Sequence, residues 1–232
     1  MGPETGKIIG ARRTAFFGGS FDPPHIGHLA IARAARELLS LDEVLFVPVG
    51  RQPLKKGLSA SYQDRVEMTR LAIAEEPGFT VSLLDAPHDD AAPNYTAETL
   101  EALAHTLPHG STLFFLMGAD SFLALNRWHR GADIPFLAEL VVASRPRETL
   151  QPLDAHLPDG LKLVSFTPES FQNDRLERWQ LADNHGRTAT LYLLPELHYD
   201  VSATALRTAI HSGKPLIPPA VLTYIRSHGL YA

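Results

Sequence analysis

A glycine-rich turn between an apolar run and an amphipathic helix is the feature that most constrains this chain. The turn covers residues 18–28, follows the apolar run 15–17, and precedes a helical repeat of apolar side chains over residues 29–39. In such a turn, backbone N–H groups can approach a phosphate, and the start of the helix favours negative charge. The imidazoles of His25 and His28 lie there, and each can donate a hydrogen bond to a phosphoryl oxygen. The segment therefore predicts a phosphate-binding site.

The rest of the chain repeats this alternation of apolar, β-branched runs with helical patterns. Strands that are apolar throughout are covered on both faces, so the pattern predicts an α/β fold with a doubly wound parallel sheet. Ligands of such sheets bind outside the carboxyl ends of the strands. The expected strands are Thr14–Phe17, Val44–Val47, Phe79–Leu84, Thr112–Met117, Leu140–Ala143 and Thr190–Leu194, and the expected helices are His28–Leu39, Tyr62–Ala74, Ala97–Thr106, Ser121–Arg127, Ala203–His211 and Pro219–Ser227.

A chain of 232 residues, of which 44% are hydrophobic, is expected to form a single domain with a sizeable core. We expect residues 1–12 to form a mobile tail. Residues 145–188 interrupt the alternation with prolines and many charges, and we interpret this segment as a solvated insertion or flap.

Charge and composition narrow the class of partner. The net charge of −5 argues against a dedicated nucleic-acid-binding surface, although a local basic pocket is compatible with it. The absence of cysteine excludes disulfides, thiol catalysis and cysteine zinc sites, and it fits a cytoplasmic protein. No apolar run approaches the length of a membrane span, so no membrane partner is expected. The sequence favours no particular oligomeric state.

A second candidate anion site lies in residues 201–207. Ser202 is suited to cap a helix that begins at the next residue, and Thr204 and Arg207 are three apart and share one face of it. Hydroxyls, helix N–H groups and a guanidinium would then converge on one anion. Taken alone, an ordinary capped helix explains this pattern better.

Two further segments are placed at element boundaries. Gly118 and Asp120 follow an apolar strand. There, glycine permits a ligand to approach the backbone closely, and the carboxylate can accept hydrogen bonds from ribose hydroxyls. The alternative is a strand-to-helix turn with Asp120 as the N-cap. Thr96 begins a helical pattern, and a simple helix start is its alternative role.

The first segment resembles the signature of the nucleotidyltransferase superfamily, Gly-x-Phe-Asp-Pro-x-His-x-Gly-His, and so implies a Rossmann-like nucleotidyltransferase fold. Residues 25–28 also match the His-Ile-Gly-His signature of class I aminoacyl-tRNA synthetases. In both families these histidines act on the phosphates of ATP. Residues 202–207 resemble the second superfamily signature, Ser-x-Thr-x-Ile-Arg, which grips the ATP phosphates. Here Leu206 replaces isoleucine, and Ala203 stands where the nicotinate branch usually has a second serine.

Three segments resemble the nicotinate-nucleotide adenylyltransferases in particular: Tyr95-Thr96, residues 118–120, and Trp128. In that family the tryptophan stacks on the pyridine ring, the threonine lies near the nicotinate carboxylate, and nearby backbone amides hold this carboxylate. His129 stands where a tyrosine often follows the tryptophan, and a backbone amide survives this change.

Two basic residues extend the resemblance. Lys55 retains the cation of the family's Pro-Pro-His-Lys segment, although Leu54 replaces its histidine, and a solvated basic loop explains Lys55 equally well. Arg145 follows the fifth expected strand and would face the nucleotide end of the sheet.

The resemblance implies adenylyl transfer from ATP to nicotinate mononucleotide, giving deamido-NAD and pyrophosphate in NAD biosynthesis. Mg²⁺ is expected to arrive bound to ATP, since the sequence shows no dedicated set of carboxylates for a metal. The resemblance assigns catalysis to His25, His28 and Arg207, ATP binding to Gly18, Gly19, Ser20, Phe21, Lys55, Gly118, Asp120, Ser202 and Thr204, and nicotinate-nucleotide binding to Tyr95, Thr96, Trp128, His129 and Arg145.

Several alternatives remain open. Nicotinamide mononucleotide could be the acceptor in place of the nicotinate form. A phosphopantetheine adenylyltransferase would share the first motif, but it is shorter and lacks the residues around Trp128. A class I synthetase would need a Lys-Met-Ser-Lys-Ser-like loop and usually a tRNA-binding domain, and the chain has neither. In a non-enzyme, the two histidines would form a transition-metal site.

Overall fold

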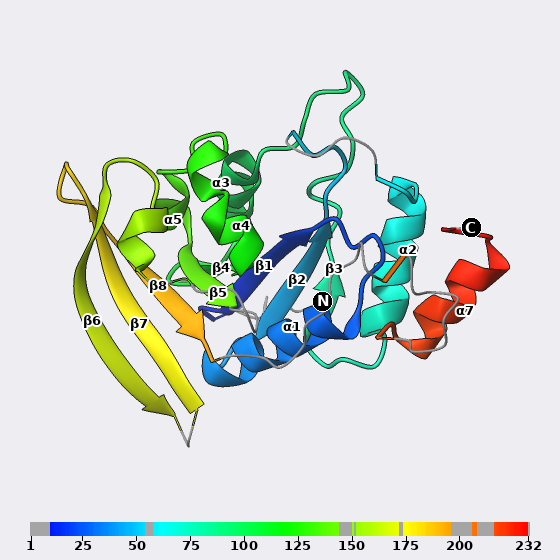
Figure 1. Cartoon of the computed structure of the whole chain (residues 1–232), viewed down its shortest axis with the longest axis horizontal. Helices are drawn as coiled ribbons and strands as arrows, with labels where there is room; N and C mark the ends of the chain where they lie inside the picture. The colour runs from blue at the N-terminus through cyan, green and yellow to red at the C-terminus, as the bar shows by residue number, and fades with distance from the viewer. Residues whose placement is uncertain are drawn as a thin grey trace, which may run out of the picture.

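One mixed sheet runs through the described part of the protein (Figure 1). The computed structural model describes residues 10–53, 58–143, 150, 152–171, 174–195, 206–207 and 216–231. The sheet has eight strands in the order β3-β2-β1-β4-β5-β8-β7-β6, of which the last two are antiparallel to their neighbours. The strands are β1 Arg13–Gly19, β2 Glu43–Pro48, β3 Phe79–Val81, β4 Thr112–Gly118, β5 Glu139–Ala143, β6 Leu161–Phe171, β7 Asp174–Asp183 and β8 Thr188–Leu194.

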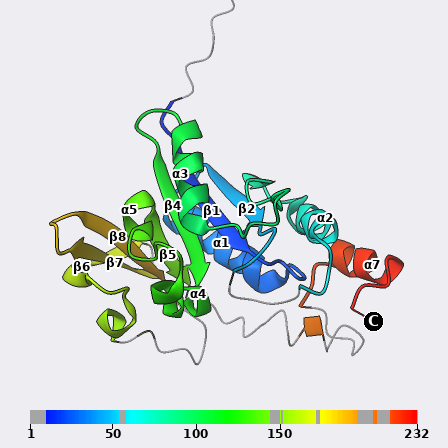
Figure 2. The same cartoon turned by 90° about the horizontal axis from the view of Figure 1, so that it is seen from above.

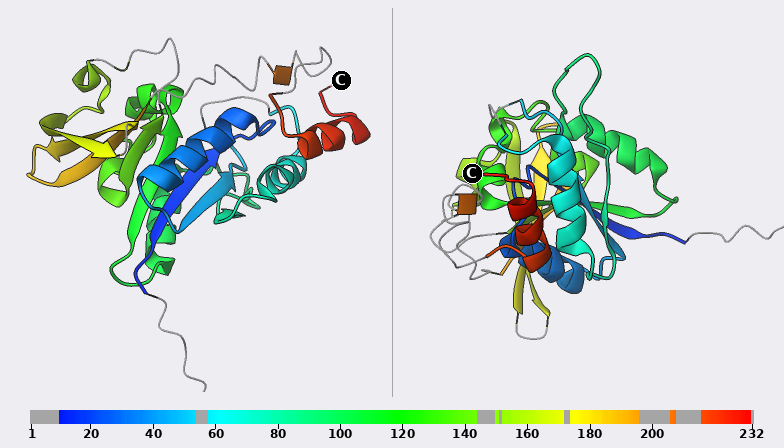
Figure 3. Two further views of the ribbon diagram at one scale, coloured as in Figure 1. Left: turned by 90° about the horizontal axis from the view of Figure 1, so that it is seen from below. Right: turned by 90° about the vertical axis from the view of Figure 1, so that its right-hand side faces the viewer.

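Helices cover both faces of this sheet, because successive side chains of each strand point to opposite sides. Ala15 and Phe17 of β1 pack into one core with α1, α2 and α7, whereas Phe16 packs into the other core with α3, α4 and α5. Figure 3 shows α2 beside α7 on their common side of the sheet. These helices are α1 Ile26–Leu38, α2 Tyr62–Ile73, α3 Thr96–Thr106, α4 Ala119–Leu123, α5 Ile134–Leu137 and α7 Pro219–Ser227.

The predicted α/β fold with a doubly wound sheet is confirmed, with local differences at the element ends. The first helix begins at Ile26 and not at His28, because extended backbone at His25 already ends the turn. The third strand stops at Val81, where its pairing with β2 ends. The helix expected at residues 121–127 consists of α4 and a separate 3₁₀ turn, η1, over Leu125–Arg127. Of the helix expected at 203–211, only residues 206–207 are described.

The sequence analysis did not predict the two antiparallel strands within residues 145–188. The described part of this segment contains a 3₁₀ turn, η2, at Leu153–His156 and then the hairpin β6–β7, which extends the sheet beyond β8 (Figure 1). Its inner strand is anchored by Leu176 and Leu181, which are buried in the two cores on opposite faces. The described part of the expected insertion therefore continues the sheet.

The first residues of the described chain are held by backbone contacts. The N–H of Arg12 donates to the Ser111 hydroxyl at 3.0 Å, and its carbonyl accepts from the N–H of Thr112 at 2.8 Å. The expected tail therefore does not extend to residue 12, and residues 1–9 lie outside the described part. No helix of the described ranges is long and apolar enough to cross a membrane.

A long loop between β3 and α3 is fixed to the end of β2 by buried polar contacts. The Asn94 side chain accepts from the N–H of Arg51 at 2.8 Å and donates to the carbonyl of Ala86 at 3.0 Å. The carboxylate of Asp85 accepts a hydrogen bond from the Thr99 hydroxyl in the first turns of α3. Burial raises the pKa of Asp85, and the Thr99 hydrogen bond opposes this shift. These contacts set the position of the N-terminus of α3.

We expect Asp85→Asn to change how stability depends on pH. The pKa of Asp85 is higher in the folded protein than the ~3.9 of an unfolded aspartate, so the folded state holds the proton more tightly. The stability that Asp85 contributes is fully present below pH ~3.9, and it is lost as the pH rises through the folded-state pKa. The measurement is urea unfolding of both proteins at pH values from below ~3.9 to above the folded-state pKa. As the pH rises, the wild type should lose stability relative to the variant.

The exposed Asp89 of the same loop provides the control. Asp89→Asn removes one negative charge without removing a buried carboxylate, so it controls for the change in net charge. Parallel pH profiles for Asp85→Asn and wild type would contradict the assignment.

Candidate active site

The carboxyl ends of β1 and β4 lie side by side in the middle of the sheet. The two strands are parallel neighbours, with Phe17 opposite Leu116, and each ends in glycine. After β1 the chain enters α1 on one face of the sheet, and after β4 it enters α4 on the other face (Figure 2). Such a switch point opens a crevice between the two departing connections, and ligands of α/β sheets bind there. The first motif and the segment after Gly118 therefore border one site, as the sequence predicts.

Gly118 leaves open space at this switch point. A Cβ on Gly118 would meet no atom of the described residues within 4 Å, and the Gly118 backbone is not in a left-handed conformation. By contrast, a Cβ on Gly131 would lie 2.1 Å from the carbonyl oxygen of Leu125. Gly131 is thus required by packing, whereas Gly118 leaves space at the carboxyl end of β4.

The two histidines of the first motif form a stacked pair at the N-terminus of α1. Their ring centroids are 3.7 Å apart with an angle of 28° between the planes. Nδ1 of His28 accepts a hydrogen bond from the backbone N–H of His25 at 3.1 Å. This contact leaves the proton of a neutral His28 on Nε2, which makes Nε2 a donor. The first turn of α1 contains no acidic residue, so the positive end of the helix dipole adds to this anion-binding character.

The preceding turn is shaped by Ser20 and Phe21. The hydroxyl of Ser20 accepts a hydrogen bond from the Gln52 amide at 3.1 Å. Phe21 has a positive φ of 47°, and its ring is 1% exposed, lying edge-on to His28 with the centroids 5.0 Å apart. The Phe21 ring therefore supports His28 from within the core, and only the backbone of Phe21 is suited to contact a ligand.

Arg207 reaches the first motif from the other end of the chain. Its Nη1 donates to the backbone carbonyl of Asp22 at 2.7 Å, across 185 positions of sequence. The two segments predicted to bind phosphate are thus brought together by a direct contact. Four other predicted site residues lie outside the described part of the chain: Lys55, Arg145, Ser202 and Thr204.

Asp22 and Arg65 are buried charged residues that the sequence analysis did not single out. Asp22 is 2% exposed and Arg65 is 1% exposed, and Nη1 of Arg65 donates to the carbonyl of Ser20 at 2.8 Å. Burial lowers the pKa of Arg65, and the negative charge of Asp22 opposes this shift. The sequence carried one signal for Arg65, which shares a helix face with the buried Met68 and Ala72. A charged residue on the apolar face of a helix requires a partner in the interior.

A second cluster contains the residues predicted to bind the pyridine nucleotide. Tyr95 precedes α3, and its ring lies 4.3 Å from that of His129 between centroids. Nε2 of His129 is 3.5 Å from a carboxylate oxygen of Glu98, and Trp128 lies against Phe115 of β4 with centroids 6.1 Å apart. Thr96 is the first residue of α3, next to this cluster. The two sequence segments assigned to one ligand are therefore neighbours in space.

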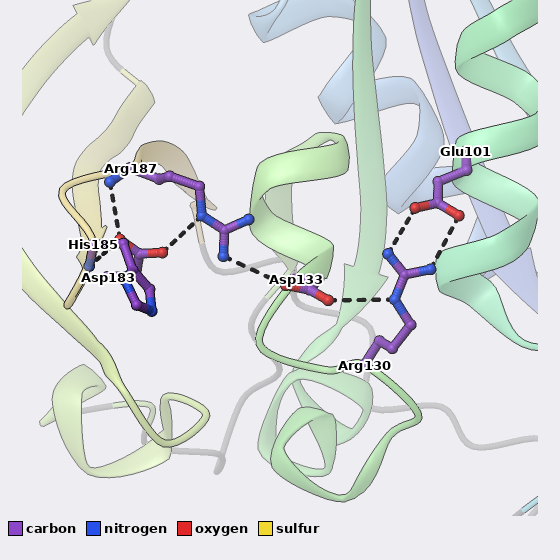
Figure 4. A network of polar contacts seen from close by, with 6 residues as sticks. All are labelled: Glu101, Arg130, Asp133, Asp183, His185 and Arg187. Carbon is purple, nitrogen blue, oxygen red and sulfur yellow. Dashed lines mark hydrogen bonds and ion pairs between the residues drawn. The ribbon is translucent and has the colours of Figure 1, made fainter.

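The loop that carries Trp128 and His129 is tied down by a network of charged side chains (Figure 4). Arg130 donates two hydrogen bonds to Glu101 of α3, at 2.6 and 3.0 Å, and a third to Asp133 at 3.3 Å. Asp133 also accepts from Arg187, which is bonded to Asp183 at the end of β7. The network thus links the loop to α3 and to the β7–β8 turn.

Asp120 is the second residue of α4 and is exposed at the end of β4. Its place at the switch point agrees with a contact to ligand hydroxyls. No group of three or more histidine, cysteine, aspartate or glutamate side chains suited to hold a metal ion occurs among the described residues.

Comparison with known proteins identifies the family. Residues 16–209 match the cytidylyltransferase-like family. A curated relative from Pectobacterium atrosepticum, named "probable nicotinate-nucleotide adenylyltransferase", is 37% identical over 94% of this chain and 98% of its own length. A relative of the same name from Thermus thermophilus is 36% identical over 94% of this chain and 99% of its own length. The chain belongs to the nicotinate-nucleotide adenylyltransferase family. The resemblance inferred from the sequence is therefore confirmed.

A solved structure agrees with this family assignment at the level of the fold. The nicotinic acid mononucleotide adenylyltransferase of Plasmodium falciparum, solved in complex with NaAD, aligns with a TM-score of 0.66 at 16% identity. The alignment covers 95% of this chain and 97% of that protein. The nicotinate-nucleotide adenylyltransferase fold thus extends over nearly the whole chain.

We expect Gly118→Ala to impair activity without affecting stability. The added methyl group contacts no atom of the described part of the chain, so the free energy of unfolding should remain within about 0.5 kcal/mol of wild type. The same methyl group projects into the space at the switch point, and a substrate displaced by about 1 Å can lose up to about 10²-fold in rate. Thermal unfolding and steady-state kinetics with ATP would measure both effects.

Gly131→Ala is the matched control for Gly118→Ala. Its methyl group would collide with the Leu125 carbonyl, so it should destabilise the protein by about 1–3 kcal/mol, the range for overpacking. Full activity of a stable Gly118→Ala protein would show that ligands do not use this part of the sheet.

Proposed function

We propose that this protein transfers the adenylyl group of ATP to nicotinate mononucleotide, producing deamido-NAD and pyrophosphate. The observation that carries the proposal is the convergence of Arg207 on the turn that ends in the stacked His25–His28 pair. These groups lie at the positive end of α1 and at the switch point of the sheet, where a polyphosphate is best accommodated. Membership of the nicotinate-nucleotide adenylyltransferase family supports the choice of acceptor.

The reaction needs no nucleophile from the protein. A phosphate oxygen of nicotinate mononucleotide attacks the α-phosphorus of ATP, the new P–O bond forms, and the bond to the bridging oxygen of the β-phosphate breaks. Pyrophosphate leaves with the electron pair of that bond. The protein therefore acts by positioning two anionic substrates and by stabilising the charge that shifts between them.

The phosphate half of the site supplies this charge stabilisation. His25 and His28 donate to oxygens of the transferring and leaving phosphoryl groups, with Nε2 as the donor on His28. Backbone groups of Gly18, Gly19, Ser20 and Phe21 line the turn, and Arg207 binds the β- and γ-phosphates. Lys55, Ser202 and Thr204 join Arg207 in this role, while Gly118 and Asp120 contact the nucleoside.

The aromatic half of the site receives the pyridine ring. The Trp128 ring stacks on nicotinate, and backbone amides near Thr96, Trp128 and His129 hold its carboxylate. Tyr95 supports this arrangement through its ring contact with His129. Arg145 also binds the mononucleotide in this proposal. The Arg130–Glu101 pair fixes the distance between α3 and the Trp128 loop.

A divalent ion, Mg²⁺ in our proposal, enters as part of the substrate. The donor set of the described residues does not suit a resident ion, because it contains no cluster of three metal-ligating side chains. Mg²⁺ prefers oxygen ligands and keeps several waters, so the triphosphate of ATP satisfies it without a protein cage.

We further propose that the chain forms a single domain, because one continuous sheet spans the described residues from β3 to β6. A cytoplasmic location stays a prediction from the composition.

We expect His25→Ala and His28→Ala each to lower kcat by about 10²-fold, the effect of losing one donor to the transition state. Both residues lie at a ligand site, so thermal unfolding should change little. Pyrophosphate release measured with saturating ATP and nicotinate mononucleotide tests this. A correctly folded variant with near-normal kcat would remove that histidine from the mechanism.

The nicotinate form of the acceptor should be preferred by at least about 10²-fold in kcat/KM over the nicotinamide form. Donors placed for a carboxylate are poorly matched to a neutral amide. Trp128→Ala should raise KM for the mononucleotide more than KM for ATP, because stacking is lost on one substrate only. Assays with each mononucleotide and with phosphopantetheine provide the comparison.

Equal efficiency with the two mononucleotides would reject the nicotinate preference while leaving adenylyl transfer intact. Activity with phosphopantetheine alone would reject a pyridine nucleotide as the acceptor.

A further inference from the structure

The chain returns to the first motif just after its last helix. The hydroxyl of Tyr231, which follows α7, donates to Oδ1 of Asp22 at 2.6 Å although 209 positions separate the two residues. Tyr231 has a φ of 62°, so the chain turns sharply to place this ring. Burial and the hydrogen bond to Asp22 raise the pKa of the phenol, which keeps it protonated and therefore a donor.

Asp22 is a buried carboxylate that depends on a complete set of donors. Oδ1 accepts from the Tyr231 hydroxyl and from the N–H of Ala60 at 3.1 Å, and Oδ2 accepts from the N–H of Ser59 at 2.7 Å. The residue is 2% exposed, so water cannot readily replace a missing donor. A buried charge that loses one of its partners is strongly destabilised, and its attraction to a neighbouring cation becomes stronger.

Besides Arg65, on whose pKa the charge of Asp22 acts, Arg207 is a cation next to this carboxylate. Its Nη1 donates to the backbone carbonyl of Asp22 at 2.7 Å and lies 3.9 Å from Oδ2 of the same residue. At that distance the guanidinium is next to the carboxylate without being hydrogen-bonded to it. Loss of the donor on Oδ1 would strengthen the attraction between the carboxylate and Arg207, because less of the negative charge would be compensated elsewhere.

We propose that Tyr231 is a positioning residue for the phosphate half of the site: its hydroxyl compensates the charge of Asp22 and so keeps Arg207 directed at the phosphates of ATP. The proposal rests on the proposed function, in which Arg207 binds those phosphates. Tyr231 itself touches neither the histidines nor the reacting atoms in this proposal. The effect of losing its hydroxyl should therefore fall on ATP and not on the mononucleotide.

Tyr224, in α7, offers a matched control seven residues before Tyr231. Its hydroxyl donates to Oδ1 of Asp64 in α2 at 3.0 Å, so Tyr224→Phe also removes a phenol–carboxylate hydrogen bond that anchors the end of the chain. Among the described residues, Asp64 is hydrogen-bonded to Ser61 and Tyr224 and to no residue of the first motif. A purely structural role for the end of the chain would make the two variants alike.

The experiment compares Tyr231→Phe, Tyr224→Phe and wild type with each substrate varied in turn. Tyr231→Phe should lower kcat/KM for ATP by about tenfold, in line with one charge-assisted hydrogen bond, and should leave KM for nicotinate mononucleotide within about twofold. Binding of pyrophosphate and of a non-reactive ATP analogue, measured by calorimetry, should weaken by a similar factor. Tyr224→Phe should change none of these values.

Removal of the charge provides an independent arm. In an Asp22→Asn background the phenol has no carboxylate charge to compensate. Adding Tyr231→Phe to that variant should therefore lower kcat/KM for ATP by less than about twofold, which is a clear departure from additivity. If Tyr231→Phe folds too poorly for assay, calorimetry well below its unfolding midpoint gives the same comparison.

Unchanged ATP parameters in Tyr231→Phe, equal losses for both substrates, or additive effects with Asp22→Asn would each overturn the proposal. Binding of the ATP analogue does not require an acceptor. A wild-type protein that binds the analogue but cannot use nicotinate mononucleotide would therefore refute the proposed acceptor, while the Tyr231 comparison would still be decided.

Discussion

The parallel pairing of β1 with β4 is the constraint on which the site depends. Because both strands end at the same edge of the sheet and their chains leave toward opposite faces, two loops that are about one hundred residues apart in sequence must face each other. One loop presents backbone groups and two imidazoles, and the other presents Gly118 and the approach to Trp128. The phosphate and aromatic halves of the site are consequences of this single pairing.

The site was predictable where its chemistry lies in a short segment, and less so where it depends on distant contacts. Residues 18–28 indicated a phosphate site because strand, turn, helix and histidines follow one another directly. The contact of Arg207 with Asp22 spans 185 positions and has no local signal, so only the family resemblance linked the two motifs. The proton position on His28 follows from one backbone N–H, a detail that spacing alone does not encode.

The same reasoning explains which strands of the fold the sequence analysis predicted and which it missed. Buried parallel strands such as the one expected at Thr112–Met117 were predicted because they are almost entirely apolar. The β6–β7 hairpin was missed because its strands mix charged and apolar residues, and a register shift between Leu163 and Ser165 interrupts the alternation of the outer strand. Val164 and Phe166 are nearly half exposed there, so the period-two signal of a half-buried strand is weak.

Two separate polar networks anchor the two halves of the site. The network around Asp22 is buried and joins the phosphate turn to residues 59–60 and to Tyr231, whereas the network around Arg130 is partly exposed and joins the Trp128 loop to α3. Removing one partner of a buried charge strongly lowers stability, whereas exposed ion pairs are screened by solvent and contribute less to stability. Because the described residues of these networks share no member, a change in one half should leave the other in place. Under the proposed function, this separation allows substitutions at the phosphate half to be read as effects on ATP, and substitutions at the aromatic half as effects on the acceptor.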